Sequence, residues 1–229
     1  MTDRILKLKL QLKHWLRYRY HRRLRNSFRN QPFNERDMLF VHVPKAAGTA
    51  VIASLFGRSA GMGHTTAKKY LQIFGGAHFY SKYRFTFVRN PYDRLVSAYE
   101  YLCRGGNNSY DLMFKQRTMD RFSDFDDFVL NGLRHDPAVQ NHVHFRRQTD
   151  FLYIGSSLAV DFVGRYENLD KDFSYLAAIA GVSATLEQKN PSQRSRTVSD
   201  YYQNPEVRQA VREFYQRDFQ ALQYDDATL

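Results

Sequence analysis

The amino-acid sequence predicts an α/β domain in three layers, with helices on both faces of a central parallel sheet. Three short apolar runs have the character of buried strands and cover residues 38–43, 84–88 and 159–164. Each run precedes a segment of helical periodicity, and this alternation of strands and helices indicates a parallel sheet. Ligands of such sheets bind beyond the carboxyl ends of the strands. We therefore expect the functional residues directly after the apolar runs.

The composition favours a single globular domain. The chain has 229 residues, of which 43% are hydrophobic and 15% aromatic, and these values argue against disorder. A chain of this length can bury one sizeable core. Cys103 is the single cysteine, which excludes an internal disulfide framework and fits a reducing compartment.

The net charge of +11 is concentrated in residues 1–30. This extension contains ten Lys/Arg and one Asp, so it carries nine of the eleven charges, whereas residues 31–229 are close to neutral. We therefore treat residues 31–229 as one domain preceded by a basic extension.

The extension has the pattern of a basic amphipathic helix. Its apolar residues recur at helical spacing, at Ile5, Leu8, Leu12 and Trp15. Its apolar runs are too short for a signal peptide or a membrane span. Such a helix suits the surface of an anionic membrane, and the alternative is a helix packed on the body or on a second subunit.

The first half of the domain has clear element boundaries. After a turn over 31–37, the first strand leads to a helix expected over 48–56. A Gly-containing loop over 57–63 precedes a second helix over 66–74.

The second strand leads into a strong helix-start signal. Asn90 suits an N-cap, and Pro91 suits the first helical turn because no N–H is needed there. The helix is expected over 92–102, and the polar stretch 104–109 is expected to be a loop.

Residues 110–150 are predicted to be helical and rich in loops, ahead of the third strand. A helix over 169–180 follows that strand. The last helix is capped by the pair Asn204–Pro205 and extends to about residue 222.

The turn after the first strand is suited to an anion. Backbone N–H groups at a helix start lack helical partners, and the helix dipole adds to their attraction for negative charge. Lys45 adds a mobile positive charge, Gly48 permits close approach of a ligand, and Thr49 offers a hydroxyl. The residues whose amides take part are Ala46, Ala47, Gly48, Thr49 and Ala50.

The turn after the second strand carries Arg89, whose guanidinium can form two parallel hydrogen bonds to a phosphate. Ser97 lies seven residues after Asn90 and returns to nearly the same helix face. Arg89 and Ser97 are predicted to hold one anion together. The two turns therefore predict a ligand with two separated anionic groups.

A phosphotransferase related to P-loop kinases is the alternative enzyme. In a P-loop a Gly precedes the Lys and a Ser or Thr follows it, whereas here Pro44 precedes Lys45 and Ala46 follows. The neighbouring strand ends in Arg89 where a magnesium-binding carboxylate is expected. Metal-dependent nucleotide hydrolysis is therefore disfavoured, and we expect no metal site.

The alternative from a different class is a non-catalytic binder of an anionic polymer or nucleic acid through the basic extension. Such binding is strongly salt-dependent. The near-neutral domain counts against this alternative, and we expect no nucleic-acid partner.

The segments PKAAGT (44–49) and FVRNPYDRLVSAY (87–99) together resemble the two cofactor motifs of the sulfotransferase superfamily. The resemblance is to the membrane-type carbohydrate sulfotransferases and their bacterial relatives. It continues through HTTAKKY (64–70), DFVGRYENL (161–169) and NPSQRSR (190–196). It implies the P-loop-like sulfotransferase fold, the cofactor 3′-phosphoadenosine 5′-phosphosulfate and a carbohydrate acceptor.

The resemblance also implies roles for individual residues. Lys45, Gly48 and Thr49 would bind the 5′-phosphosulfate, and Arg89 and Ser97 would bind the 3′-phosphate. The loop that closes over the nucleotide is represented by Ser192, Arg194 and Arg196.

Transfer to a hydroxyl needs a general base, and histidine titrates near neutrality. His64 stands where the family commonly carries its catalytic histidine, and His78, before the second strand, is the reserve. His42 lies within the first strand and is expected to be structural. Two roles are considered for Glu167, an acid/base group or a structural support for Arg165.

The acceptor is expected to contact His78 and basic side chains after residue 141. The latter are His142, His144, Arg146 and Arg147. Gln148 is a weaker candidate. Aromatic and basic side chains suit a sugar or an acidic glycan, and the sequence leaves open which sugar and which hydroxyl. We expect a cytoplasmic location with peripheral contact to the inner membrane through residues 1–30, and a homodimer is left open.

Overall fold

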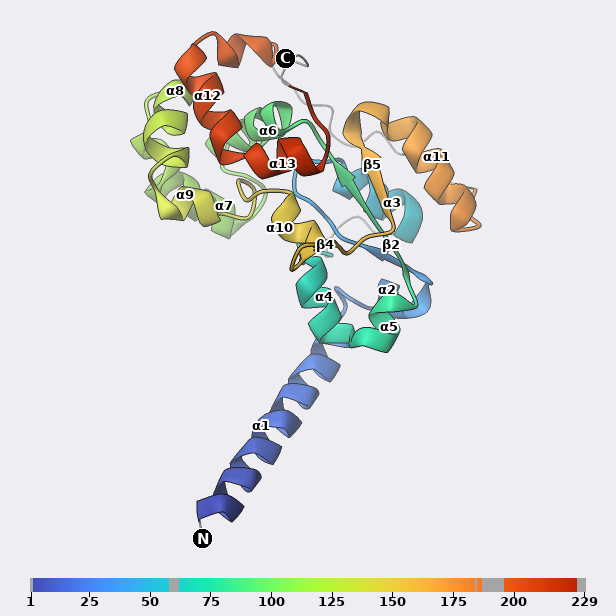
Figure 1. The fold of residues 1–229 in the computed structure, drawn as a ribbon. Helices are drawn as coiled ribbons and strands as arrows, with labels where there is room; N and C mark the ends of the chain where they lie inside the picture. Colours follow the sequence, from blue (N-terminus) through green and yellow to red (C-terminus); the bar gives the residue numbers. More distant parts are fainter. Residues whose placement is uncertain (1, 58–61, 184, 187–195, 226–229) are drawn as a thin grey trace.

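A computed structural model describes residues 2–57, 62–183, 185–186 and 196–225, without the side chains of residues 2–8, 10, 14 and 17. Figure 1 shows a body built around a small sheet, from which the N-terminal helix α1 (Thr2–Arg25) projects.

In the described part of the chain, the main sheet consists of three parallel strands in the order β1 (Met38–Phe40), β2 (Tyr83–Val88) and β5 (Phe162–Arg165). The central strand β2 therefore places the chain that leaves β1 beside the chain that leaves β2. The side chains of β1 and the second half of β2 are buried, as in a sheet covered on both faces. The predicted α/β fold, with a parallel sheet flanked by helices, is confirmed.

Two strands are shorter than the apolar runs that predicted them. The first ladder ends at Phe40, although the N–H of Val41 still donates to the carbonyl of Phe85 at 2.9 Å. The third run begins outside the sheet, where the N–H of Ala159 donates to the carbonyl of Leu152 at 2.9 Å. An apolar run reports burial, and residues 41–43 after the first ladder and residues 159–160 before the third ladder are buried without belonging to the sheet.

Helices follow the strands in the predicted order. Those between β1 and β2 are α3 (Gly48–Phe56), α4 (Ala67–Phe74) and α5 (Gly76–Tyr80). Helix α6 (Pro91–Cys103) follows β2, and α11 (Leu169–Ile179) follows β5.

The predicted helix starts are confirmed by their hydrogen bonds. The side chain of Asn90 accepts from the N–H of Tyr92 at 3.0 Å, and that of Asn204 accepts from the N–H of Glu206 at 3.0 Å. The predicted last helix is instead two helices, α12 (Pro205–Phe214) and α13 (Gln216–Ala221). The break occurs at Tyr215, whose buried hydroxyl donates to the carbonyl of Phe145 at 2.5 Å.

The remaining elements are short and confirm the helical, loop-rich character of residues 110–150. The helical ones are α2 (Pro32–Glu35), α7 (Ser109–Arg117), η1 (Met119–Arg121), α8 (Phe125–Asp127), η2 (Phe128–Leu133), α9 (Pro137–Asn141), α10 (Thr149–Leu152), η3 (Tyr166–Asn168) and η4 (Ser199–Tyr202). Strands β3 (Tyr153–Ile154) and β4 (Ser157–Leu158) form a small antiparallel pair.

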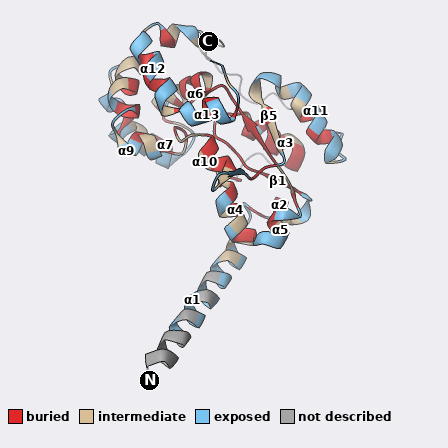
Figure 2. Ribbon diagram, in the orientation of Figure 1, coloured by how far each residue is buried: buried red, intermediate tan, exposed pale blue. Residues whose placement is uncertain are grey.

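Within the described residues, the core consists of two groups of buried apolar side chains. Figure 2 marks the buried residues along the ribbon. The sheet group surrounds β1 and β2 and includes Leu39, Phe85 and Phe151. The helical group lies among α6, η2 and α12 and includes Leu95 and Phe128. The chain leaving β2 passes from the first group to the second.

A buried polar network joins the two groups. The carboxylate of Asp218 on α13 accepts from the N–H groups of Gln148 and Thr149, at 2.7 and 2.9 Å. The side-chain amide of Gln148 accepts from the N–H of Arg89 at 3.0 Å and donates to its carbonyl at 2.8 Å. The end of β2 is therefore tied to α13 through one glutamine.

Arg94 on α6 extends this network. Its fully buried guanidinium donates to the carbonyls of His144 and Arg146, at 3.1 and 2.7 Å. Burial raises the pKa of Asp218, while Arg94 and the donated hydrogen bonds oppose that rise. These contacts hold residues 144–149 against both α6 and α13.

Helix α1 touches the body only near its C-terminal end, as far as its described side chains show. The His21 ring bonds the carbonyl of Gln72 on α4, and the Arg25 guanidinium donates to the side chain of Asn34 at 3.1 Å. Leu12, Trp15 and Leu16 remain 55%, 50% and 54% exposed. Within the described residues, no helix combines the length and apolar character that crossing a bilayer requires.

The network predicts a large effect of Asp218→Ala on stability. The substitution leaves two buried N–H groups and the Thr149 hydroxyl without their acceptor and removes the negative charge that opposes Arg94. We therefore expect the free energy of unfolding to fall by about 3 kcal/mol or more. Asp120→Ala removes an exposed partner of Lys115 and is expected to change it by about 0.5 kcal/mol or less. Urea titrations of both variants measure the difference, and equal losses would contradict the role assigned to the network.

Candidate active site

The turn after β1 has the backbone form of an anion site. Lys45 and Ala47 adopt positive φ angles of 67° and 60°, which curl the chain ahead of α3. The first helical bond runs from the N–H of Val51 to the carbonyl of Ala47 at 3.1 Å, so the amides of Gly48, Thr49 and Ala50 belong to the free first turn. Ala46, Gly48 and Ala50 are buried, while Lys45 is partly exposed and Thr49 exposed. The turn therefore has the backbone form that the prediction requires, and anion binding by these amides stays a prediction.

Gly48 is required by a neighbouring side chain. A Cβ atom at this position would lie 1.9 Å from Nε2 of His42. The His42 ring is held in place because its Nδ1 donates to the carbonyl of Gly63 at 3.0 Å and its face stacks on Phe40. The structural role expected for His42 is to fill the space beneath the turn.

Lys45 lies over an aromatic ring. Its Nζ is 4.0 Å from the centre of the Tyr101 ring on α6, a cation–π contact. The Tyr101 hydroxyl donates to the carboxylate of Asp111 at 2.6 Å. The lysine of the first turn is therefore positioned by a helix that follows the second turn.

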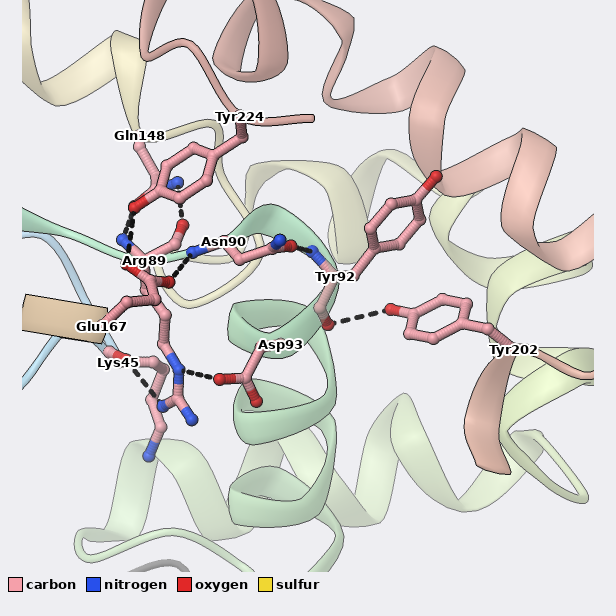
Figure 3. A network of polar contacts seen from close by, with 9 residues as sticks. All are labelled: Lys45, Arg89, Asn90, Tyr92, Asp93, Gln148, Glu167, Tyr202 and Tyr224. Atoms are coloured by element: carbon pink, nitrogen blue, oxygen red, sulfur yellow. Dashed lines mark hydrogen bonds and ion pairs between the residues drawn. The ribbon is translucent and has the colours of Figure 1, made fainter. Parts of the chain in front are cut away.

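The two cationic turns are in direct contact (Figure 3). Nη1 of Arg89 donates to the carbonyl of Lys45 at 3.2 Å, and Nε donates to the Asp93 carboxylate at 2.6 Å. The guanidinium also lies 3.9 Å from the centre of the Tyr166 ring, and Arg89 is only 5% exposed. Asp93 thus occupies one side of the guanidinium that the sequence assigned to a phosphate.

The structure describes Ser97 and, of the three residues expected in the closing loop, Arg196. Ser97 lies four residues beyond Asp93 on α6 and is partly exposed, so Arg89, Asp93 and Ser97 follow one face of the helix start. Arg196 is exposed, and its guanidinium donates to the carbonyl of Asp200 at 3.0 Å. Ser192 and Arg194 lie outside the described residues.

The backbone around Arg89 is held by residues to which the sequence assigned other roles. Gln148, a weak acceptor candidate, is fully buried and bonds both polar groups of the Arg89 backbone. Glu167 accepts from the N–H of Asn90 at 2.7 Å and from the hydroxyl of Tyr224 at 3.0 Å, rather than supporting Arg165 (Figure 3). Neither residue carried a local signal, because each acts on backbone that is distant in sequence.

His64 lies beside the first turn, between two other histidines. Its ring centre is 4.2 Å from that of His42 and 5.5 Å from that of His144. Nδ1 of His64 is 3.2 Å from the carbonyl of His42, and since a carbonyl only accepts, Nδ1 carries the proton. Nε2 is then the basic nitrogen. Burial, with Lys45 and Arg29 nearby, lowers the pKa of His64 to about 4, so the ring is neutral at pH 7.

His142 and His144 are buried rather than open to an acceptor. His142 is stacked on Phe114 with ring centres 3.9 Å apart, and neither of its ring nitrogens has a described hydrogen-bond partner. Burial lowers the pKa of both rings. Nε2 of His144 is 3.8 Å from the carboxylate of Asp111. The prediction that these two rings line the acceptor cleft is therefore not supported by their positions.

His78 does not reach the site. It lies on α5, immediately before the amino end of β2, whereas Lys45 and Arg89 follow the carboxyl ends of their strands. Its ring stacks on Phe74, and its Nδ1 is 3.4 Å from the Arg25 guanidinium. His78 is therefore at the opposite edge of the sheet and is removed from the reserve base and acceptor roles.

Arg146 and Arg147 line an open hollow of about 470 Å³. The other lining residues are Gln140, Asn141, Asp150 and Phe214. Nε of Arg147 donates to the carbonyl of Phe214 at 2.7 Å, and Nε of Arg146 is 4.0 Å from the Asp150 carboxylate. The hollow is polar and basic, and its lining does not include the residues of the two turns.

Comparison with known proteins identifies the family of the chain. The sequence matches the profile described as "Sulfotransferase family" over residues 33–225. The chain belongs to the sulfotransferase family. The two cationic turns and the sheet between them lie within the matched region, and the resemblance noted in the sequence is confirmed.

Two kinds of curated sulfotransferase are similar to the chain. It is 28% identical over 165 residues to carbohydrate sulfotransferase 11 of Rattus norvegicus and of Mus musculus, covering 62% of this chain and 46% of the relative. It is 26% identical over 164 residues to carbohydrate sulfotransferase 9 of Homo sapiens, covering 60% and 36%. The chain thus spans less than half the length of these relatives. No solved structure matches it.

Proposed function

We propose that the protein transfers the sulfuryl group of 3′-phosphoadenosine 5′-phosphosulfate to a hydroxyl of a carbohydrate. The observation that carries the proposal is the contact between the two cationic turns, with Arg89 donating to the carbonyl of Lys45 at 3.2 Å. One nucleotide with anionic groups at both ends fits a site of this kind. Membership of the sulfotransferase family and the printed names of its relatives support the reaction class.

The residues of the two turns fit this nucleotide. The amides of residues 48–50, the Thr49 hydroxyl and Lys45 would hold the 5′-phosphosulfate at the start of α3. Arg89 and Ser97 would hold the 3′-phosphate, with the Arg89 guanidinium shared between the phosphate and Asp93. The bound nucleotide supplies an activated sulfuryl group.

The proposed chemistry uses two side chains. Lys45 places its positive charge, together with the α3 amides, where negative charge develops on the leaving phosphate. His64 is neutral at pH 7, and its Nε2 takes the proton of the attacking hydroxyl. We expect no metal to be needed, because the lysine and the amides already meet the developing charge.

The hollow at Arg146 and Arg147 is the proposed place for part of the acceptor. Two guanidinium groups beside the amides of Gln140 and Asn141 suit a polar or acidic glycan. A cytoplasmic location stays a prediction from the sequence, whereas the sugar that is modified and a homodimer stay open.

The nucleotide site predicts binding of adenosine 3′,5′-bisphosphate without metal. Titration calorimetry in EDTA should show tight binding that Lys45→Gln weakens about tenfold to a hundredfold, since a charge-assisted contact contributes about 1.5–3 kcal/mol. Lys171→Gln, at an exposed position of α11, is the matched control and should bind as the wild type does.

Two outcomes would replace this proposal. Binding of ATP only with magnesium would indicate a phosphotransferase. Binding of anionic polymers that disappears on deletion of residues 1–30 and falls steeply with salt, without nucleotide binding, would indicate the non-catalytic binder.

The role of His64 predicts a specific kinetic loss. Transfer of labelled sulfate to a panel of envelope polysaccharides and lipid-linked sugars should identify an acceptor, and His64→Ala should lower kcat about a hundredfold or more with nucleotide affinity retained. His135→Ala, on an exposed loop, is the control. Because the pKa of His64 is lowered to about 4, kcat/KM should stay level from pH 8 to about 5 and fall as the pH drops through about 4. Near wild-type turnover in His64→Ala would exclude it as the base.

We also propose that α1 binds the surface of an anionic lipid bilayer. Leu12, Trp15 and Leu16 form one apolar stripe on its exposed part, and the Arg19 guanidinium lies 4.7 Å from the centre of the Trp15 ring. The extension that carries the stripe is strongly basic, since residues 1–30 have a net charge of +9. Pairing of two such helices would bring like charges together, whereas an anionic surface attracts them.

Trp15 provides the test, because it is the only tryptophan of the chain. Its emission should shift to shorter wavelength on vesicles containing phosphatidylglycerol but not on phosphatidylcholine alone. Leu12→Glu should weaken binding about tenfold or more, because burial of one leucine contributes roughly 1.5–3 kcal/mol. Leu158→Glu, at a comparably exposed leucine of the body, is the control. Unchanged emission on the anionic vesicles would contradict the proposal.

A further inference from the structure

Asp111 is a buried carboxylate that the proposed chemistry has not used. It lies on α7, is 2% exposed, and follows the polar loop 104–109. Oδ2 accepts from the Tyr101 hydroxyl at 2.6 Å and from the Asn108 amide at 2.7 Å. Charged carboxylates are rarely buried to this degree unless they are paired.

The loop before α7 is folded around this carboxylate. Gly106 has a φ of +64°, and a Cβ atom there would lie 2.2 Å from Cβ of Asp111. The N–H of Asn107 donates to the Tyr101 hydroxyl at 2.9 Å, so the same hydroxyl joins the loop to Asp111. The Gly/Asn-rich composition of this loop is therefore explained by the need to enclose Asp111.

Two chains of contact lead from Asp111 to the proposed active site. Through Tyr101 it reaches Lys45, whose Nζ lies 4.0 Å from the centre of that ring. Through its other oxygen it faces Nε2 of His144 at 3.8 Å, and the His144 ring is 5.5 Å from that of His64. One carboxylate thus lies behind both the lysine and the histidine of the proposed reaction.

We infer that Asp111 is a positioning residue with two roles. It compensates the positive charge that appears on His64 when this ring takes the proton of the acceptor hydroxyl. It also holds the Tyr101 ring against Lys45. In this step the O–H bond of the attacking hydroxyl breaks and an N–H bond forms at Nε2 of His64. No covalent change occurs at Asp111. The inference rests on the proposed function for this step, whereas the electrostatic link between Asp111 and His64 can be measured without it.

The surroundings of His64 make such a carboxylate necessary. A proton added to the ring meets the positive charges of Lys45 and Arg29, both of which disfavour it. Asp111 acts in the opposite direction on His64 and on His142. The groups that face the His64–His144 pair are His42, Lys45, Arg29, Tyr101, Asp111, His142 and Arg94. Among these described groups Asp111 is the only carboxylate.

Neutral replacements of Asp111 test the inference. In Asp111→Asn the shape is kept and the charge removed, and Asp111→Ser is a second neutral variant in case the first misfolds. The His64 ring resonance, assigned by its absence in His64→Gln, is followed by NMR from pH 8 down to about pH 2.5, so that the range includes pH values below its pKa of about 4. We expect the titration of His64 to move to lower pH in the neutral variants. It should stay in place in Asp120→Asn, the surface control, which lies on η1 directly after α7.

A kinetic measurement accompanies the titration and needs no carbohydrate. Release of inorganic sulfate from 3′-phosphoadenosine 5′-phosphosulfate, with water as acceptor, should fall about tenfold or more at pH 7 in Asp111→Asn. The fall in the rate of sulfate release at acid pH should occur at a lower pH than in the wild type. The affinity for the nucleotide should change about threefold or less. Asp111→Glu, which restores the charge, should recover part of the rate.

The outcomes separate the inference from the proposed function. A wild-type protein that binds no adenosine 3′,5′-bisphosphate and releases no sulfate, with a His64 titration that still depends on Asp111, would reject the proposed function and keep the electrostatic link. An unchanged His64 titration and an unchanged fall in the rate of sulfate release at acid pH in a folded neutral variant would overturn the inference. Failure of both neutral variants to fold would identify Asp111 as a structural residue and would also overturn it.

Discussion

The paired hydrogen bonds between the Gln148 side chain and the backbone of Arg89 are the contact on which the site geometry depends. Gln148 is itself fixed by the Asp218 carboxylate, and Glu167 holds the next amide along, at Asn90. The chain leaving β2 is thus held from two sides, which directs the Arg89 side chain to the carbonyl of Lys45. Buried polar groups are costly unless they are fully paired, so this network favours one arrangement of the turn.

The site lies where the two groups of core side chains meet. Lys45 follows β1 of the sheet group, whereas its aromatic neighbour Tyr101 lies on α6, whose buried residues belong to the helical group. Arg94 fixes the segment that carries His144 against the same helix. The distance between the lysine and the histidine cluster is therefore set by how the two groups pack. Polar bonds at their boundary contribute to catalysis, in the proposed function, by fixing that packing.

Much of the fold and the two turns could be predicted because their signals are local. The Asn90–Pro91 start, the α3 span and the adjacency of Lys45 and Arg89 follow from composition and from the rule that parallel strands end at one edge. The histidines could not all be sorted in this way, since the burial and ring neighbours of His142 and His144 depend on packing between distant segments. His78 and Asp111 show the two failures, one residue placed too near the site and one overlooked. Gln148 and the break at Tyr215 depend on partners about sixty to seventy residues away and are likewise invisible to local patterns.

The contact of His42 with Gly48 links two positions that a sequence reader would treat separately. The imidazole fills the volume that any larger residue at position 48 would need. Relatives with a bulky ring at position 42 are therefore expected to have glycine at position 48. A relative with serine at position 42 has room for alanine at position 48. Variation at these two sites is expected to be correlated by steric exclusion, whatever anion the loop has evolved to hold.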